Sequence, residues 1–236
     1  MRHVLAPTGK LRVGVYTGSP QSLMVDTQSG EPYGMGYDLG RELARSLDLP
    51  FEPVIFQKNG DVLEAARNNQ IDLALVNATP VRAEYLAFAQ AILFSEQSYL
   101  VGPGCPAQSI AEIDAQGLIV GVSGGSTSET ILPTLLKKAK VIAINSLEDV
   151  KQQLILAGID AFGTNKGILY ALSHQIPGSR VLNGAWGFER IALGVPKSRK
   201  EAIPLIQSFS SAIQENGFLH ATAQRAGVQG VSLKET

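Results

Sequence analysis

The sequence carries the same strand and helix pattern twice, and this repeat constrains the fold more than any other feature. LRVGVY (11–16) and LIVGVS (118–123) open the two halves, and IDLALVN (71–77) and IDAFGTN (159–165) close them. Each half runs strand, helix, strand, helix, and then an apolar Ile-Asp strand with a polar exit. This alternation predicts two similar α/β lobes. No short period of about 20–50 residues is present, so the pattern is not that of a solenoid.

Hydrophobic spacing and turn residues place the remaining elements. Pro50 stops the first long helix, and a helix with Pro80 in its first turn is expected over TPVRAEYLAFA. The last forty residues predict two helices separated near Gly217. The expected strands also cover 50–56, 95–104, 140–144 and 190–196, and the expected helices fall within 36–50, 60–70, 79–89, 124–139, 145–158 and 165–177.

Local signals assign several residues a structural role. Asp61 is a plausible N-cap of the second helix, and Asn145 or Ser146 is expected to cap a helix of the second half. Gly34 and Gly36 are interpreted as turn residues before a helix, because no strand precedes them as a nucleotide-binding loop would require. Asp72 and Asp160 occupy matched places in their apolar strands. Their symmetry indicates a shared structural task, such as tying backbone amides.

Composition excludes several classes of protein. The formal net charge of the 236 residues is -1, which argues against a nucleic-acid-binding protein. No stretch reaches the ~18 to 20 apolar residues of a membrane span. Cys105 is the one cysteine, expected to be buried or inert, and the three histidines show no metal-ligand spacing. No cofactor or metal is therefore expected. The first residues lack the apolar core of a signal peptide, which is absent or was removed.

Polar residues follow the predicted strands and should line a cleft between the lobes. In α/β sheets, ligands bind at the carboxyl ends of strands. The segments that leave these ends are 17–19, 77–82, 124–127 and 164–166. A ligand-binding cleft at these four segments is the expectation.

Arg82 and the GGSTSE segment are the clearest candidates for ligand contact. The guanidinium of Arg82 could grip a carboxylate through two parallel hydrogen bonds, or it could be a surface arginine paired with Glu84. GGSTSE (124–129) could cradle an anion, but Ser126 or Thr127 with Glu129 also fits a helix cap. The sequence alone shows no Ser-His-Asp, Cys-His or paired-carboxylate arrangement.

These motifs together resemble the solute-binding proteins of polar amino-acid ABC importers, known as family 3. The resemblance runs from residue 11 to about 219, and rests on GYDLGRELAR, IDLALVNATPVRAEYLAFA and VGVSGGSTSE, in that order. It implies an α/β, two-lobed clamshell of the type II periplasmic-binding-protein kind. Two crossing hinge strands are expected near Ser98–Gly102 and Glu189–Gly194. Residues 1–97 plus 195–236 would form the first lobe and 98–194 the second.

The resemblance also implies a function. Such proteins capture a small carboxylate or amino-acid-like ligand, close their lobes on it and present it to a membrane permease of the ABC transporter. The chain would then be a periplasmic, monomeric binding protein that is not an enzyme and binds no nucleic acid. Arg82 would hold the ligand's α-carboxylate with help from Thr79 and Thr127, and the backbone of Asn77 would accept from its amine. The expected ligand-binding residues are Tyr16, Asn77, Thr79, Arg82, Ser126, Thr127 and Asn165.

Three departures from the family pattern concern the ligand. Asn165 stands where relatives usually keep an aspartate for the ligand's ammonium group. Residues 19–23 replace an aromatic wall, and residues 88–92 replace the usual segment after the arginine. An amide lacks the charge-assisted strength of a carboxylate, at a cost of about 1 to 3 kcal/mol. Unless another acid compensates, the hypothesis is a small carboxylate whose amine is modified or absent.

Other functions on the same scaffold stay open. The chain could be an enzyme similar to cyclohexadienyl dehydratases, but that interpretation needs a cleft acid with a tuned pKa, and none is evident from the sequence. It could be a sensory ligand-binding module of a longer protein. It could also be a binding protein that has lost its ligand.

Overall fold

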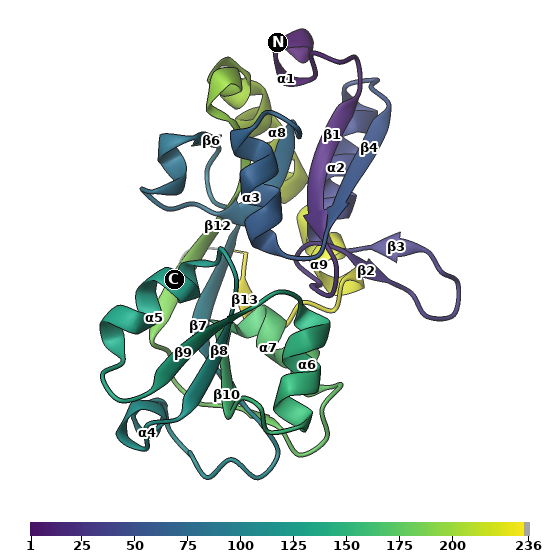
Figure 1. Ribbon diagram of the computed structural model, residues 1–236. Coiled ribbons are helices and arrows are strands. Elements are labelled where there is room, and N and C mark those ends of the chain that lie inside the picture. The colour runs from purple at the N-terminus through teal and green to yellow at the C-terminus, as the bar shows by residue number, and fades with distance from the viewer. Residues whose placement is uncertain (234–236) are drawn as a thin grey trace.

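The protein consists of two α/β lobes joined by two neighbouring strands, β7 and β12 (Figure 1). The structure, a computed structural model, describes residues 1–233. The strands are β1 (Leu11–Tyr16), β2 (Met24–Val25), β3 (Pro32–Tyr33), β4 (Phe51–Phe56), β5 (Leu73–Asn77), β6 (Leu86–Phe88), β7 (Leu93–Val101), β8 (Ile119–Ser123), β9 (Lys140–Ile144), β10 (Ala161–Asn165), β11 (Arg180–Val181), β12 (Gly187–Pro196) and β13 (Val231–Ser232).

Helices cover the sheet of each lobe. The helices are α1 (Arg2–Leu5), α2 (Met35–Ser46), α3 (Asn59–Arg67), α4 (Ile110–Ala115), α5 (Thr127–Leu135), α6 (Leu147–Ile155), α7 (Lys166–Ser173), α8 (Ile203–Glu215) and α9 (Phe218–Arg225), with 3₁₀ turns η1 (Arg82–Glu84) and η2 (Lys197–Ala202). Within residues 1–233, none of these helices combines the length and the apolar character that crossing a membrane requires.

The repeat predicted from the sequence is confirmed by the sheet topology. In the first lobe the parallel order is β4-β1-β5, and in the second it is β9-β8-β10. β12 lies antiparallel beside β5, and β7 lies antiparallel beside β10. Because β7 and β12 also pair with each other, one continuous sheet runs through both lobes.

The two connecting strands pair with each other at residues of β7 that precede the predicted segment. Residues 93–97 of β7 pair with residues 187–191 of β12. Of the predicted segment Ser98–Gly102, residues 98–101 instead belong to the part of β7 that pairs with β10, and Gly102 follows the strand. The second predicted segment, Glu189–Gly194, falls inside β12. The lobe boundaries at 97/98 and 194/195 stay a prediction.

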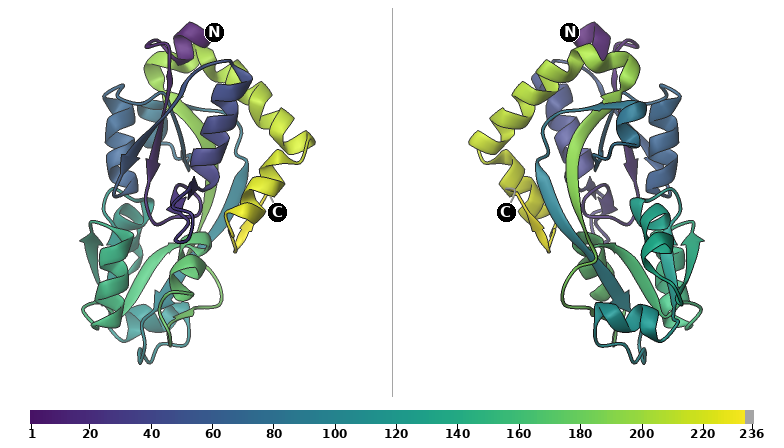
Figure 2. Two further views of the ribbon diagram at one scale, coloured as in Figure 1. Left: turned by 90° about the vertical axis from the view of Figure 1, so that its right-hand side faces the viewer. Right: turned by 90° about the vertical axis from the view of Figure 1, so that its left-hand side faces the viewer.

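The sheet is covered on both faces at β5, which explains the continuous apolar run of this strand. Leu73 and Leu75 pack into one core with α2, α8 and α9, whereas Ala74 and Val76 pack into another with α3. Since successive strand residues point to opposite faces, a strand buried on both sides must be apolar throughout. Helices α8 and α9 meet at Gly217, which is in the left-handed conformation with φ +78°. They run along the first lobe toward β13, which pairs with β7 (Figure 2).

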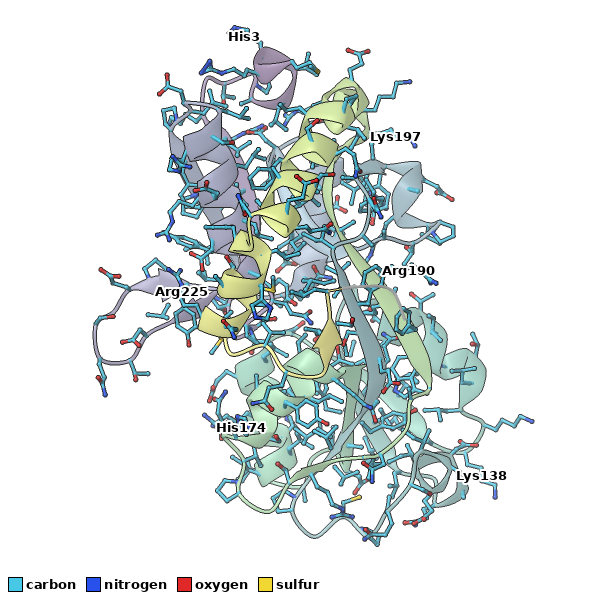
Figure 3. The ribbon with its side chains drawn as sticks, turned by 180° about the vertical axis from the view of Figure 1, so that it is seen from behind. His3, Lys138, His174, Arg190, Lys197 and Arg225 are labelled. Atoms are coloured by element: carbon cyan, nitrogen blue, oxygen red, sulfur yellow. The ribbon has the colours of Figure 1, made fainter. Side chains whose placement is uncertain are left out.

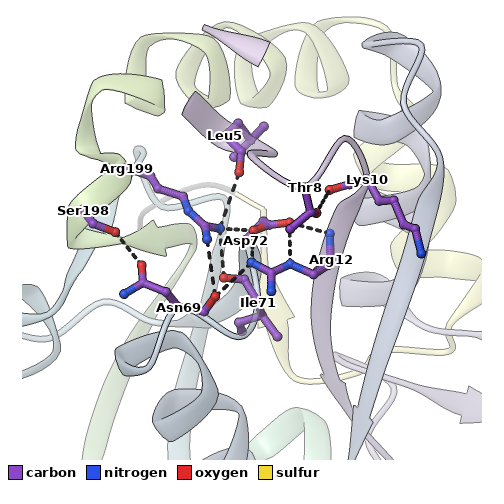
Figure 4. Close-up of polar contacts among 9 residues, drawn as sticks. All are labelled: Leu5, Thr8, Lys10, Arg12, Asn69, Ile71, Asp72, Ser198 and Arg199. Atoms are coloured by element: carbon purple, nitrogen blue, oxygen red, sulfur yellow. Dashed lines mark hydrogen bonds and ion pairs between the residues drawn. The ribbon is translucent and has the colours of Figure 1, made fainter. Parts of the chain in front are cut away.

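The matched aspartates perform the structural task that their symmetry predicted. Asp72 Oδ2 accepts a hydrogen bond from the backbone N–H of Arg12 at 2.8 Å, and Asp160 Oδ2 accepts one from that of Ile119 at 2.7 Å. Each aspartate thereby fixes the beginning of the neighbouring strand in its own lobe. Asp72 is also buried between the guanidinium groups of Arg12 and Arg199 (Figure 4). The repeat therefore extends to side-chain contacts.

Three local predictions were wrong. The segment TPVRAEYLAFA is not an α-helix, because Leu86–Phe88 forms β6 against β12 and leaves only the turn η1. Asp61 does not cap α3. It lies in the first turn, and Lys58 occupies the cap position without a side-chain bond. Gly36 lies inside α2, whereas Gly34 is the turn residue before it, with φ +136°.

Ser146, one of the two proposed caps of α6, accepts from Asp149 N at 3.0 Å, so this prediction is confirmed.

Candidate ligand-binding site between the lobes

A small polar cavity lies where the two lobes meet the connecting strands. Its volume is about 40 Å³, and we call it the inner cavity. The carboxyl ends of β5, β8 and β10 all reach it, as expected for a cleft at strand ends. Its lining is Tyr16, Gln21, Asn59, Leu75, Val76, Asn77, Arg82, Ser123, Ser126, Thr127, Thr164, Asn165, Ile168, Glu189 and Ile191.

The carboxylate of Glu189, on β12, is the centre of the polar network. Its Oε1 accepts hydrogen bonds from Thr127 Oγ1 at 2.9 Å, Gln97 Nε2 at 3.1 Å and Asn77 Nδ2 at 3.3 Å. Its Oε2 accepts from Asn165 Nδ2 at 2.9 Å. The donors come from β5 in the first lobe, from α5 and β10 in the second, and from β7 between them. One side chain thus links both lobes.

Opposing effects act on the ionisation of Glu189. Burial raises the pKa of its carboxyl above the ordinary value, and this is the largest effect. The hydrogen bond from Thr127, the charge of Arg82 and the amides of Asn165 and Asn77 act to lower that pKa. Since Glu189 is only 6% exposed, an ionised carboxylate depends on these partners.

Arg82 contributes the opposite charge to the same cavity and is only 5% exposed. Its Nη1 donates to the carbonyl oxygen of Asn77 at 3.0 Å, and its backbone N–H donates to Thr79 Oγ1 at 3.2 Å. Burial lowers the pKa of the guanidinium, and the charge of Glu189 opposes this effect. The alternative of a surface arginine paired with Glu84 does not hold, because Arg82 is buried beside Glu189.

Two helix caps orient side chains of the second lobe. Asn165 caps α7, and its Oδ1 accepts from Ile168 N at 3.2 Å, so its Nδ2 is directed at Glu189. Ser126 caps α5 by accepting from Glu129 N at 3.3 Å. Glu129 in turn accepts from Gly125 N at 2.6 Å, one residue before the cap, so the arrangement is similar to a capping box. The capping interpretation of GGSTSE is confirmed, and Thr127 remains free to contact Glu189.

Other polar groups of the inner cavity are buried without full pairing. Gln21 Nε2 and Asn59 Oδ1 have no hydrogen-bond partner among the described residues. Buried polar atoms are nearly always paired, so two unpaired atoms on one cavity wall indicate a place for polar ligand groups. Tyr16 Oη donates to Ser19 Oγ at 3.4 Å, and burial raises the pKa of Tyr16 to about 12. Its hydroxyl is therefore neutral.

The lobes touch through glycine backbones beside this cavity. A Cβ atom added to Gly60 on α3 would lie 2.6 Å from the carbonyl oxygen of Gly124. A Cβ added to Gly125 would lie 2.5 Å from the Cα of Gly60. Both distances are shorter than real Cβ contacts, so only glycine permits this approach. The structure is accordingly a closed arrangement of the lobes.

The structure brings together most of the residues predicted from the sequence. Tyr16, Asn77, Arg82, Ser126, Thr127 and Asn165 all line the inner cavity. Thr79 accepts a hydrogen bond from the backbone N–H of Arg82 and lines a neighbouring cavity instead, together with Arg82, Ser126 and Thr127. Lys166, at the end of a predicted cleft segment, pairs with Glu96 on β7.

Glu189 was missed from the sequence, although the strand pattern carried a signal for it. Residues alternate between the two faces of a strand, so Glu189 shares a face with Ile191. Phe188 and Arg190 are exposed, whereas Glu189 and Ile191 are buried. An acid in register with a buried isoleucine was therefore a candidate for a buried functional carboxylate.

Residues that could hold a metal are not grouped. Among residues 1–233, no cluster of three or more histidine, cysteine, aspartate or glutamate side chains could bind a metal ion. His3 and His174 lie far apart, in different lobes (Figure 3). Cys105 is buried, as the sequence predicted.

Comparison with known proteins agrees with this architecture. The profile of the family described as bacterial extracellular solute-binding proteins, family 3, matches residues 11–227. The solute receptor for L-cysteine of Neisseria gonorrhoeae superposes with a TM-score of 0.84 at 21% identity, over 94% of this chain and 91% of the receptor. At this identity the likeness shows the fold.

Curated relatives include two kinds of protein. Membrane-bound lytic murein transglycosylase F of Shewanella baltica (strain OS155) is 30% identical over 166 residues, which are 70% of this chain and 33% of that protein. The chain therefore spans about a third of the length of this relative. A glutamine-binding protein of Geobacillus stearothermophilus is 25% identical over 199 residues, which are 81% of this chain and 74% of that protein.

Proposed function

Because this chain belongs to the bacterial extracellular solute-binding proteins of family 3, we propose that it captures an α-amino acid between its lobes for an ABC importer. Arg82 binds the ligand's carboxylate, and Glu189 binds its ammonium group. The observation that carries the proposal is the pair of opposite, buried charges on the wall of one cavity between the lobes. Such a pair matches the zwitterionic head of an amino acid.

Glu189 changes the expectation about the ligand's amine. The hypothesis of a carboxylate without a free amine rested on the lack of an acid at position 165. It was made on the condition that no other acid compensates, and Glu189 is such an acid, because its Oε2 lies 2.9 Å from Asn165 Nδ2. The acid comes from a connecting strand instead of from the end of β10. We therefore favour a ligand with its α-amine intact.

The volume of the inner cavity indicates that binding involves motion. At about 40 Å³ it is far smaller than the ~300 to 1,000 Å³ of usual ligand sites. An amino-acid head can enter only if the lobes separate and some contacts of Glu189 are exchanged for contacts to the ligand. Such a hinge motion, with ligand contacts formed by both lobes, is the closure that a permease can recognise.

Calorimetric titration tests the proposal. The protein is titrated with the twenty L-amino acids and, for those that bind, with their des-amino analogues. We expect at least one amino acid to bind and its des-amino analogue to bind about 10- to 100-fold more weakly. Equal affinity for both members of a pair would contradict the role of Glu189.

Variants of Arg82 test the other half of the site. Arg82→Lys keeps the charge beside Glu189 but loses the two-pronged geometry for a carboxylate, so the variant should fold and bind at least about tenfold more weakly. Arg45→Ala is the control, since Arg45 pairs with Glu42 on the exposed surface of α2. An unchanged affinity in Arg82→Lys and Arg82→Ala would refute the placement of the carboxylate.

The alternative of an enzyme is weaker on structural grounds, although Glu189 is a cleft acid with a raised pKa. Among the residues that line the inner cavity, no second acid and no histidine accompanies Glu189 as a partner for proton transfer. Incubation with prephenate or arogenate should give no turnover. Measurable turnover that is lost in Glu189→Gln would favour the enzyme.

A ligand-sensing module of a larger protein is the second candidate. The similarity to a third of a membrane-bound transglycosylase favours it. The amino-acid site would be the same, and only the partner would differ. Ligand-dependent stimulation of ATP hydrolysis by a reconstituted permease supports the importer, and its absence with every candidate permease of the source organism favours the module.

A further inference from the structure

A second, larger cavity adjoins the inner one, and we call it the outer cavity. Its volume is about 350 Å³, within the usual range of ligand sites. Arg82, Ser126 and Thr127 line both cavities. A ligand whose carboxylate contacts Arg82 can therefore extend from one cavity into the other.

The wall of the outer cavity is mainly apolar and comes from both lobes. Leu63, Val81 and Tyr85 contribute from the first lobe, and Ile131 contributes from α5 of the second. Val81 is 64% exposed and Ile131 is 38% exposed, although both are large apolar side chains. Exposed apolar residues that line one cavity from both lobes indicate a surface that becomes buried on binding.

The charges around the outer cavity restrict what can fill it. Its lining contains Arg82 but no acidic residue. The guanidinium carbon of Arg67 lies 4.4 Å from the centre of the Tyr85 ring, which adds a second positive charge at this wall. Among the lining residues a lysine or arginine side chain would find no counter-ion, whereas a neutral apolar side chain would bury the exposed wall.

We infer that the outer cavity binds the side chain of the ligand, and that the ligand class is amino acids with branched aliphatic or aromatic side chains. This inference rests on the proposed function, because the head of the ligand must bind at Arg82 and Glu189. It adds a specificity determinant, the apolar side chains of Val81 and Ile131, which line the outer cavity from the two lobes. The side chain closes the cleft by contacting both lobes at once.

Titration with L-alanine, L-leucine, L-phenylalanine and L-arginine tests the inference. L-leucine should bind roughly 50-fold more tightly than L-alanine, the gain expected from burying three further carbon atoms. L-phenylalanine should also bind more tightly than L-alanine, and L-arginine should bind more weakly than L-leucine.

A matched pair of variants locates the effect. Ile131→Trp fills the outer cavity and should weaken L-leucine binding at least about tenfold while leaving L-alanine unchanged. Leu135→Trp, on the same helix at a 49% exposed residue outside the cavity, should change neither.

The outcomes separate this inference from the proposed function. If L-alanine binds as tightly as L-leucine, or L-arginine binds most tightly, and Arg82→Lys still weakens binding, the outer-cavity inference is overturned and the proposed function stands. Equal effects of Ile131→Trp on L-alanine and L-leucine also overturn it. If no amino acid of the twenty binds, the proposed function fails and the inference fails with it.

Discussion

Replacing Glu189 by glutamine removes the negative charge of the site and keeps the size of the side chain. A hydrogen bond between charged groups contributes about 1.5 to 3 kcal/mol. Loss of the charge-assisted contact to an ammonium group should therefore weaken amino-acid binding by about one to two decades. The affinity of the des-amino analogue should not fall, because that ligand makes no such contact.

The same substitution has a calculable effect on folding. Asn165 cannot turn its amide, because its Oδ1 accepts from Ile168 N. The best orientation of the new glutamine side chain points its oxygen at Thr127, Gln97 and Asn77 and its NH₂ at Asn165, which leaves two donors facing each other. An unmade buried hydrogen bond costs about 1 to 3 kcal/mol, and removal of a buried charge offsets part of it. The melting temperature should fall by no more than about 10 °C.

The assay combines calorimetric titration with thermal unfolding and includes a rescue. Asn165→Asp in the Glu189→Gln background places an acid at the end of β10, beside position 189, and aspartate can still cap α7. We expect amino-acid binding to recover in the double variant. Wild-type affinity in Glu189→Gln, with the fold intact, would refute the role of Glu189 in holding the ammonium group.

The closed lobes, the matched aspartates and the raised pKa of Glu189 each lead to a further prediction. Gly60→Ala should stabilise helix α3 by about 1 kcal/mol but obstruct closure of the lobes. The radius of gyration in X-ray scattering should therefore increase and amino-acid binding should weaken. An unchanged radius of gyration and affinity would contradict the contact of Gly60 with Gly124 and Gly125. Asp72→Ala should lower the free energy of unfolding in urea by about 3 to 5 kcal/mol, because it leaves buried arginines unpaired. Asp160→Ala should lower it by only about 1 kcal/mol. Equal losses in the two variants would contradict the additional role of Asp72 in pairing the arginines. Burial raises the pKa of Glu189, so the folded state binds the proton of this carboxyl more tightly than the unfolded state does. The stability that comes from this protonation is fully present below the ordinary pKa of glutamate and is lost as pH rises through the pKa of Glu189 in the folded protein. As pH falls, amino-acid binding should therefore begin to weaken already above the ordinary glutamate range, because Glu189 takes up its proton there while Arg82 stays charged and Tyr16 stays neutral. The Glu189→Gln variant should lack this pH dependence. The same pH profile of binding in the wild type and in Glu189→Gln would exclude Glu189 as its source.

The repeated strand pattern was sufficient to predict the lobes because local periodicity and burial agree there. β5 is apolar throughout since both of its faces are covered, and β9 falls at the predicted residues. The failure at Leu86–Phe88 has a different cause. That segment has a helical pattern, but pairing with β12 overrides local preference, and β12 lies a hundred residues further along the chain.

The site was predictable where a residue ends a strand or lies in the segment that leaves it, as Asn165 does at the end of β10 and Arg82 does after β5. Glu189 reaches the same cavity from a connecting strand, and its hydrogen bonds to Asn77 and Gln97 span 112 and 92 residues. Sequence spacing does not show such convergence. The outer cavity was hidden for the same reason, because Val81 and Ile131, which line it, are 50 residues apart in the chain.

A crystal structure with the amino acid that binds most tightly in the titrations is the most direct test of the central claim. The account predicts the ligand's carboxylate within hydrogen-bond distance, about 2.7 to 3.2 Å, of the Arg82 guanidinium and its ammonium group at the same distance from Glu189. A ligand bound in the reverse orientation, or one that leaves Glu189 bonded only to Thr127, Gln97, Asn77 and Asn165, would contradict it.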